Sequence, residues 1–400
     1  MIKNKTNILY VFHVSSVGGG SYCLLNMVKR LDRELFNPIV LLKNHGPLCD
    51  ELEKLGATVV LDNSISIVPY NSFVFSLDSL KLIYSMLFSL HRVEYWIKKT
   101  DADIVHINTM MMYPYLFLIN KLGKKAVIHI REHWPKNEHK FQLNIALRII
   151  KRYADKIIGI NEQSAQIVDA PEKTTVIYDW IDFENRDEKI DFTKLFGPEY
   201  EKLKIFLFLG GTIWLKGPLE VIEVFSKYVT SKDARLLIVG CDTKELEFKG
   251  IRGNVKKLLS LFNYNTYANK VKLLAQKDDR IVFIPSTYQI KSLIEQSFCM
   301  VSFFTIPHAN LPIAESTWLG KPTISTYTPE AVEYSANCKA SLLFEMNNKD
   351  DFKNKIQFAL DNEELMCEYA QDGISVIREK FDPIINSSKL NNIYKCLINI

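Results

Sequence analysis

The feature that most constrains the fold of this chain is a regular alternation of short β-rich runs with longer segments of helical periodicity. In the first half the predicted strands are NILYVFHV (7–14), NPIVLL (37–42), ATVVLD (57–62), DIVHI (103–107), KAVIHI (125–130) and DKIIGI (155–160). Such alternation predicts a parallel sheet with helices on both faces. The near-continuous Val, Ile and Leu content of these runs agrees, because both faces of such a sheet are covered.

The same alternation begins again after a charged stretch. Its predicted strands are KIFLFLGG (204–211), ARLLIVG (234–240), RIVFIP (280–285), CMVSFF (299–304) and PTIST (322–326). We therefore expect an α/β protein with two Rossmann-like domains whose parallel sheets face a central cleft, where ligands of such sheets bind. The expected parts are a first domain 1–180, a linker 181–202, a second domain 203–380 and a C-terminal helix 381–400 that packs back on the first domain.

Composition indicates a soluble globular protein with no nucleic-acid partner. Apolar residues make up 47% and charged residues 24% of the 400 positions, which is usual for globular chains. The net charge of +4 is too small for a nucleic-acid footprint. The seven cysteines are scattered without a C-x-x-C pair, which favours a reducing compartment and no zinc site or disulfide framework. No segment has the pattern of a signal peptide or a membrane span, so we expect a cytoplasmic location.

Three glycines, Gly18, Gly19 and Gly20, separate the first predicted strand from a helical segment. A glycine-rich loop in this position lets backbone N–H groups approach a phosphate in front of a helix N-terminus. The spacing is not G-x-G-x-x-G, so a dinucleotide site is only weakly supported. The alternative is a tight turn that needs glycine torsions, and the sequence leaves both interpretations open.

The second half opens with the same strand, glycine and helix arrangement in FLGGTIWLKGPLEVIEVF. Here a lysine, Lys216, stands beside the predicted helix start, close to Gly211 and Thr212. A lysine in this place can meet a phosphate as a point charge. A solvated surface lysine is the plainer alternative.

A third helix end is predicted in NLPIAESTWLGKP (310–322). Asn310 or a neighbour is expected to cap the helix, Pro312 to start it, and Glu315 to lie in its first turn, where a carboxylate favours the positive end of the helix dipole. The functional alternative is that this end faces an anion while Glu315 accepts hydrogen bonds from a hydroxyl pair attached to it, which offsets the cost of burying the carboxylate. Three such helix ends would suit a pyrophosphate.

The order of VGGGSYCLLNMVKRL, GGTIWLKGPLEVIEVF, ARLLIVG, NLPIAESTWLGKPTISTYTPEAVE and ASLLF resembles glycosyltransferase family 4, retaining enzymes of GT-B fold. The resemblance covers nearly the whole chain and is most specific over 310–333. It implies that Glu315 binds the ribose of a nucleotide-sugar donor and Lys216 its diphosphate, which Gly18 to Gly20 approach from the other domain. The remaining donor-binding residues expected are Gly211, Thr212, Ile284, His308, Asn310, Leu311, Pro312 and Glu333.

The chain also departs from the family pattern. The family's first glutamate, which touches the donor sugar, falls on Pro307, followed by His308. The arginine that joins the lysine on the diphosphate falls on Gly211 or Thr212. Glycines are usual where Pro329 and Glu330 stand, although Glu333 matches the acidic residue after them. The proposed roles of Glu315 at the ribose and Lys216 at the diphosphate are retained, with fewer charges around them. Weaker donor binding, an unusual donor sugar or a loss of activity would each be compatible with these departures.

Polar residues follow two strands of the first domain. The resemblance implies a histidine near the transferred sugar in IHIREHWPK (128–136), and we expect His133 and Glu132, beside Arg131, to be catalytic together with Lys216. His106 and Asn108 end another strand, and a histidine there is more often structural than catalytic.

Two further segments have a plain structural interpretation. DAD (101–103) has the D-x-D pattern of metal-dependent transferases of another fold, but it precedes a strand and is interpreted as a turn. No His, Cys and carboxylate cluster has metal-ligand spacing, so no metal and no cofactor is expected. The segment 73–99 is apolar at helical spacing with a basic end. It is predicted to be a core helix, with peripheral contact to the inner face of a membrane as the alternative.

These observations predict a metal-independent, retaining hexosyltransferase. Its donor would be a UDP- or GDP-linked sugar, and its acceptor a hydroxyl of a glycan or lipid-linked glycan in bacterial surface polysaccharide synthesis. A nucleotide-sugar epimerase on the same fold, or a catalytically silent homologue that acts as a binding or scaffold partner, is the alternative.

Overall fold

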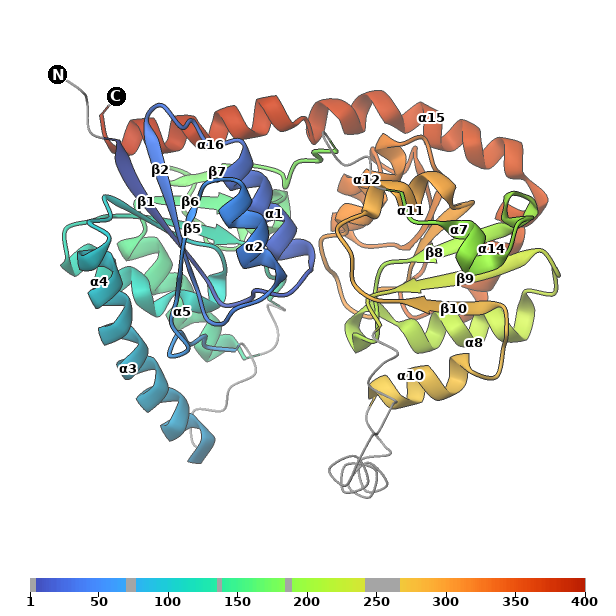
Figure 1. Cartoon of the computed structure of the whole chain (residues 1–400), viewed down its shortest axis with the longest axis horizontal. Helices are drawn as coiled ribbons and strands as arrows, with labels where there is room; N and C mark the ends of the chain where they lie inside the picture. Colours follow the sequence, from blue (N-terminus) through green and yellow to red (C-terminus); the bar gives the residue numbers. More distant parts are fainter. Residues whose placement is uncertain (1–4, 70–76, 135–138, 184–188, 242–266, 400) are drawn as a thin grey trace. The chain divides into compact units, whose positions relative to one another are not determined.

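The computed structural model describes residues 5–69, 77–134, 139–183, 189–241 and 267–399 (Figure 1). The chain divides into two compact units, one formed by Met1–Asp182 with Phe381–Ile400 and the other by Phe183–Lys380. Each unit contains one sheet, and all its strand pairs are parallel. The predicted α/β class with two Rossmann-like parallel sheets is confirmed.

The first unit holds a seven-stranded sheet in the order β3-β2-β1-β4-β5-β6-β7. The strands are β1 Thr6–Phe12, β2 Phe36–Leu42, β3 Thr58–Leu61, β4 Ile104–Ile107, β5 Lys125–Ile130, β6 Lys156–Gly159 and β7 Thr174–Val176. The helices are α1 Gly19–Lys29, α2 Pro47–Lys54, α3 Leu77–Lys99, η1 Met110–Met112, α4 Pro114–Lys121, α5 Lys140–Tyr153, α6 Glu162–Gln166 and α16 Pro383–Leu397.

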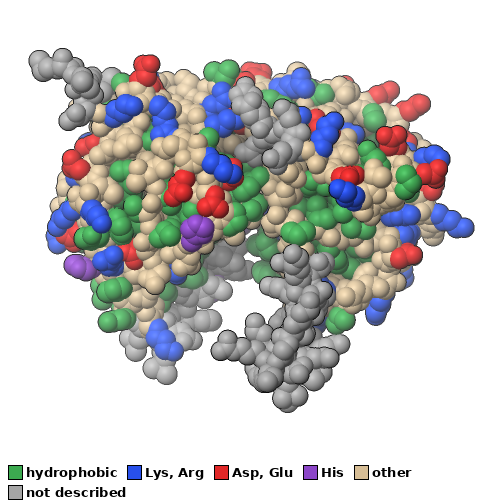
Figure 2. Space-filling view, viewed as in Figure 1, with side chains coloured by type: hydrophobic (Ala, Val, Ile, Leu, Met, Phe, Trp, Pro, Cys, Tyr) green, Lys and Arg blue, Asp and Glu red, His purple; other side chains and the backbone are tan. Residues whose placement is uncertain are grey.

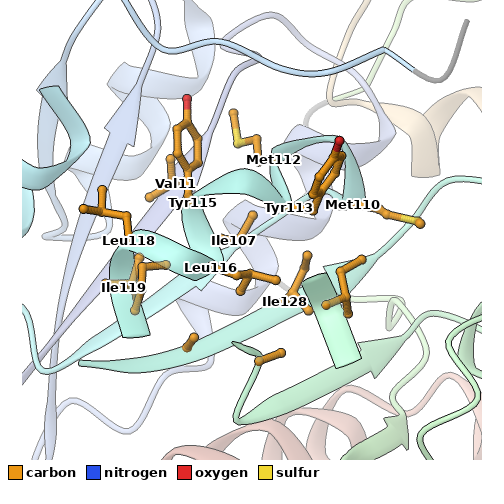
Figure 3. Close-up of a cluster of buried hydrophobic side chains, with 14 of the residues drawn as sticks. Val11, Ile107, Met110, Met112, Tyr113, Tyr115, Leu116, Leu118, Ile119 and Ile128 are labelled. Carbon is orange, nitrogen blue, oxygen red and sulfur yellow. The ribbon is translucent and has the colours of Figure 1, made fainter. Parts of the chain in front are cut away.

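Helices cover both faces of this sheet. Residues of β1 alternate between two cores, as the two-residue period of a strand requires: Leu9 and Val11 face one, Ile8 and Tyr10 the other. The first core is closed by α3, α4 and α5, and Figure 3 shows the α4 side chains lying over β4 and β5. The second core is closed by α1, α2 and α16, so the C-terminal helix contributes Tyr394 and its neighbours to the first unit.

The second unit holds a six-stranded sheet in the order β10-β9-β8-β11-β12-β13. The strands are β8 Lys204–Phe208, β9 Ala234–Val239, β10 Ile281–Ile284, β11 Cys299–Ser302, β12 Thr323–Thr326 and β13 Ser341–Phe344. The helices are α7 Phe192–Phe196, η2 Tyr200–Lys202, η3 Trp214–Lys216, α8 Pro218–Tyr228, α10 Tyr267–Ala275, α11 Ile290–Gln296, α12 Leu311–Trp318, α13 Pro329–Tyr334, α14 Lys349–Asp361 and α15 Glu363–Lys380.

Residues 181–202 were expected to form a linker, but the residues of this stretch that the structure describes belong to the two compact units. Ile181 is buried in the first unit, where its N–H donates to the Phe381 carbonyl at 3.1 Å. Residues 189–202 belong to the second unit, where Phe192 of α7 is buried against strand residues such as Leu207. The charged residues of this stretch therefore alternate with apolar ones that cover one face of the second sheet.

Candidate functional site

The turn after β8 lies against the ends of two neighbouring strands. Gly211 has φ of 54°, and a Cβ there would lie 2.5 Å from the Gly240 carbonyl oxygen at the end of β9. The Ile284 carbonyl accepts the N–H groups of Gly240 and Cys241 at 3.0 and 3.1 Å, which joins β10 to the same edge. Thr212 follows in the turn and is half-buried. The turn is thus fixed at the carboxyl edge of the second sheet.

Lys216, the last residue of η3, is a half-buried cation at this edge. Its Nζ donates to the Leu209 carbonyl at 3.1 Å, and burial lowers the pKa of its ammonium group. Among the described residues no carboxylate forms an ion pair with it. A buried charge normally has a counterion, so this position is suited to an anionic ligand.

The loop that carries Lys216 is held from the next strand. Gly217 has φ of 66°, and a Cβ there would lie 2.2 Å from the Phe303 carbonyl oxygen. The Thr305 N–H donates to the Leu215 carbonyl at 3.0 Å. Since Phe303 and Thr305 follow β11, the two loops form one rigid surface.

Helix α12 begins at Leu311, one residue before the predicted start at Pro312. Asn310 occupies the N-cap position, but its side-chain amide donates to the Ser302 and Ser325 hydroxyls at 2.8 and 3.2 Å and makes no capping bond. Pro312 lacks an N–H, and that of Ile313 donates to the Asn310 carbonyl at 3.0 Å. With Leu311 as its first residue, this helix end presents fewer backbone donors to an anion than a helix without proline.

The prediction that Glu315 lies in the first turn of this helix is wrong. Helix α12 starts at Leu311, so Glu315 is its fifth residue and lies in the second turn. Its side chain is buried, with 4% of the residue exposed. The physical reason is that the serine hydroxyls of β11 and β12 hold Asn310 at the N-cap position.

His308 and Glu333 lie on two neighbouring parts of the same unit. His308, in the loop between β11 and α12, is half-buried, with its ring centroid 5.2 Å from that of Phe304. Glu333 is buried on α13, which packs against α12. The Glu333 carbonyl accepts a hydrogen bond from the Lys380 ammonium group at 3.1 Å. The second unit therefore contains every donor-site residue predicted beyond Gly18 to Gly20.

The glycine turn after β1 is open. Gly18 has an extended backbone with φ of 178°, and helix α1 begins at Gly19 with no side-chain cap and no acidic residue in its first turn. A Cβ at Gly18 or Gly19 would meet no atom within 4 Å, whereas one at Gly20 would lie 3.1 Å from the Phe12 ring. Nothing in the described fold requires glycine at the first two positions, which favours the approach of a ligand over a strained turn.

Sequence reasoning missed His13, which lies between β1 and this glycine turn. Its Nδ1 is buried with no hydrogen-bond partner among the described residues. Burial, aided by the nearby Lys43, lowers its pKa to about 4. A neutral imidazole thus lies beside the open turn. The available signal was its position directly after β1, which ends at Phe12.

Arg131 and Glu132, in the loop after β5, are already paired inside the first unit. The Arg131 guanidinium forms an ion pair with Asp179 and donates from Nε to the Asn108 side chain at 3.0 Å. The Glu132 carboxylate accepts from the Thr109 hydroxyl and, at 2.8 Å, from the Met110 N–H, while burial raises its pKa. These contacts join the loops after β4 and β5 and leave both side chains half-buried.

His133 follows in the same loop. It is half-buried and adjoins the buried Trp134. Its catalytic role stays a prediction, as does that of Glu132.

His106 has a structural role, as its sequence position suggested. It is fully buried, with Nδ1 2.6 Å from the Tyr394 hydroxyl of α16 and Nε2 3.2 Å from His129 Nδ1. Burial, with a contribution from Arg131, lowers its pKa to about 3. A neutral histidine pair therefore joins the C-terminal helix to the sheet.

The D-x-D sequence lies at the amino end of β4. Asp101 adopts φ of 44° in the turn, and Asp103 accepts the Asn7 N–H at 2.9 Å. In the part of the chain that the structure describes, no group of three His, Cys, Asp or Glu side chains could hold a metal ion. No helix within these described residues has the length and apolar character needed to cross a membrane.

Comparison with known families identifies the chain. Residues 17–185 match the family described as Glycosyltransferase Family 4, and residues 190–375 match Glycosyl transferases group 1. The chain belongs to glycosyltransferase family 4. The predicted resemblance is confirmed over nearly the whole length of this family 4 chain. Among curated protein sequences none matches it.

Solved structures show the same GT-B fold. Anabaena Alr3699/HepE in complex with UDP and glucose superposes with a TM-score of 0.74 at 16% identity, covering 97% of this chain and 99% of that one. A glycosyltransferase from Rickettsia africae has a TM-score of 0.70 at 20% identity, with 99% of each chain covered. Sucrose-phosphate synthase from Thermosynechococcus elongatus has a TM-score of 0.70 at 12% identity, covering 99% and 100%. At these identities the likeness establishes the fold of the family 4 chain.

Proposed function

We propose that this glycosyltransferase moves a hexosyl group from a nucleoside-diphosphate sugar to a hydroxyl of a glycan or lipid-linked glycan, with retention of the donor's anomeric configuration. The observation that carries the proposal is Lys216, a half-buried cation without a described carboxylate partner at the carboxyl edge of the second sheet. A diphosphate placed there would be its counterion. The pathway we propose is bacterial surface polysaccharide synthesis in the cytoplasm.

Lys216 would act on the leaving group. When the bond between the anomeric carbon and the diphosphate oxygen breaks, negative charge develops on that oxygen, and a fixed cation stabilises it. The acceptor hydroxyl would attack from the leaving-group side, so no covalent nucleophile is needed. The D-x-D carboxylates lie at the amino end of β4, the opposite edge from Gly18. We therefore propose that Lys216 supplies the positive charge, and activity should survive a chelator.

Glu315 would bind the ribose. A carboxylate buried to this extent gains most from two hydroxyl donors, which the ribose of a nucleotide provides. Sugar preference would be set in the loop that carries His308, because Pro307 occupies the place of the family's first glutamate.

The first test is donor binding, with UDP as the probe because Anabaena Alr3699/HepE is known in complex with UDP-glucose. Thermal unfolding of the full chain would be followed with UDP, GDP and ADP and with UDP-glucose. A ligand at a hundred times its dissociation constant adds about 2.7 kcal/mol, or a shift of roughly 5–10 °C for a domain of this size. A shift that is lost in Glu315→Gln supports the proposal. No shift with any nucleotide would contradict it and favour a role as a binding partner.

A further inference from the structure

The outer face of α3 is apolar where a surface helix is normally polar. Its inner face buries Met86 and Val93 against the first sheet. On the outer face Tyr84, Leu87 and Phe88 follow at helical spacing and are 75%, 61% and 53% exposed. A helix of a soluble domain usually places charged residues there. The sequence expectation of a core helix is therefore met on one face only.

The exposed part of α3 extends past the sheet. The helix has 23 residues, or about 34 Å, whereas β4, which follows it, has four residues and spans about 13 Å. The C-terminal end of α3 adjoins the amino end of β4, so its first half reaches beyond the carboxyl edge of the sheet (Figure 1). That is the edge where Gly18 to Gly20 and the loop of Glu132 lie. The apolar face is therefore on the functional side of the first unit.

Basic side chains accompany this apolar face. Helix α4 packs against α3, and α5 packs against α4. The outer stripe of α5 begins with Phe141, which is 66% exposed, and continues with Arg148 and Lys151. The 14 residues of α5 include four basic side chains and no acidic one. On the face of the first unit that Figure 2 displays, exposed hydrophobic side chains lie beside Lys and Arg side chains.

We propose that the outer surface of α3, α4 and α5 binds an anionic lipid bilayer. Tyr84, Leu87, Phe88 and Phe141 would enter the headgroup region, and the basic residues of α5 would contact lipid phosphates, a combination typical of interfacial helices. The inference rests on the proposed function, because it places the acceptor-side edge next to a membrane that presents a lipid-linked acceptor hydroxyl. The positive charge on α5 favours a lipid surface over a second, equally basic copy of the chain.

The test is flotation of the full chain with two kinds of vesicle. One kind is pure phosphatidylcholine, and in the other one third of the lipid is phosphatidylglycerol. The wild type should float with the anionic vesicles, and the Leu87→Ser/Phe88→Ser variant should partition about tenfold to a hundredfold less. Lys140→Gln and Arg148→Gln should each lower binding about fivefold and weaken its salt dependence.

The matched control is Ile384→Ser/Ile385→Ser on α16, where the two residues are 67% and 45% exposed on the helix layer that covers the opposite face of the same sheet. This variant should float like the wild type. The UDP-induced thermal shift is measured on every variant. A variant that keeps the shift is folded and binds the donor nucleotide, so its loss of flotation can be assigned to the α3 and α5 surface.

Three results would overturn the proposal. They are the absence of wild-type binding to anionic vesicles, equal loss in the α16 control, and equal binding to both vesicle types. A fourth result would come from sedimentation. If the wild type were a dimer that did not bind vesicles, and Leu87→Ser/Phe88→Ser were a monomer, the surface would bind a second copy of the chain.

Discussion

The turns after β1 and β8 occupy equivalent places in the two units, but their glycines differ in the space that surrounds them. After β1, a Cβ at Gly18 or Gly19 would meet nothing within 4 Å. After β8, a Cβ at Gly211 or Gly217 would collide with the Gly240 or Phe303 carbonyl oxygen at 2.5 or 2.2 Å. The first turn is open, and the second is packed against its neighbouring strands.

The charge at the two turns differs as well. The first residue after β1 is His13, whose pKa of about 4 keeps it neutral near pH 7. The first residue after β8 is Leu209, whose carbonyl accepts a hydrogen bond from the Lys216 ammonium group. One unit thus offers open backbone beside a neutral ring, and the other a rigid loop with a fixed cation. We infer that the second turn is the better suited of the two to hold a diphosphate.

The largest expected effect is on Lys216. Lys216→Met should lower the rate at which nucleoside diphosphate is released from the donor identified in the binding test by about a hundredfold to a thousandfold, because a preorganised charge at the leaving group is lost. Lys227→Met, at an exposed position on the following helix, should leave the rate unchanged. If Lys216→Met reacted at the wild-type rate, the positive charge at the second turn would not contribute to catalysis.

Gly217→Ala should destabilise the second unit. The positive φ and the collision with Phe303 together should cost about 2–5 kcal/mol in the free energy of unfolding, measured in urea. Gly123→Ala is the matched control, since Gly123 has φ of 67° but no atom within 4 Å of the place that a Cβ would take. It should lose only the conformational part, about 1–2 kcal/mol. Equal losses would show that the packing of the second turn does not matter.

His13 should make stability depend on pH. Its folded pKa of about 4 lies below the ordinary value of 6.5, so between these values the unfolded chain binds a proton that the folded protein does not. Stability should therefore fall as the pH drops from 6.5 towards 4, by about 1.4 kcal/mol per pH unit from this group. His13→Gln should remove that part of the slope in unfolding measured at several pH values. The slope from the buried His106 should remain, and an unchanged total slope would argue against a neutral His13.

The smallest effect on stability is expected at Gly18. Gly18→Ala should change the free energy of unfolding by no more than about 0.5 kcal/mol, because the space above it is empty. If the donor diphosphate approaches this turn, the affinity for UDP should still fall, which calorimetric titration would detect. If Gly18→Ala lost stability but kept its affinity for UDP, Gly18 would be needed for packing and not for ligand binding, which is the opposite of what we expect for the first turn.

Much of the fold could be predicted from sequence because buried parallel strands are nearly continuous apolar runs. The exception is β7, whose three residues are only half-buried and lack such a run. The charged stretch before β8 has the sequence character of a linker, because Phe192 and its apolar neighbours are separated by charged residues. Only packing against Leu207 shows that they form part of a core.

The candidate site was predictable to a lesser degree. Local spacing indicated the glycine turns and Lys216, since a turn between strand and helix is a short-range feature. The start of α12 was not predictable, because it depends on Ser302 and Ser325 from two other strands. The pairing of Arg131 with Asp179 likewise joins residues 48 positions apart, so sequence could not show that this guanidinium already has a counterion.

The sequence by itself determined the two runs of alternating strands and helices, and with them two parallel sheets whose carboxyl edges carry the polar turns. This follows from local periodicity, which requires no knowledge of distant residues. Tertiary structure alone decided which glycines are sterically required, which charges are paired and which face of α3 is left uncovered. Each of those outcomes depends on atoms from distant parts of the chain that meet only when the sheets and their helices have packed.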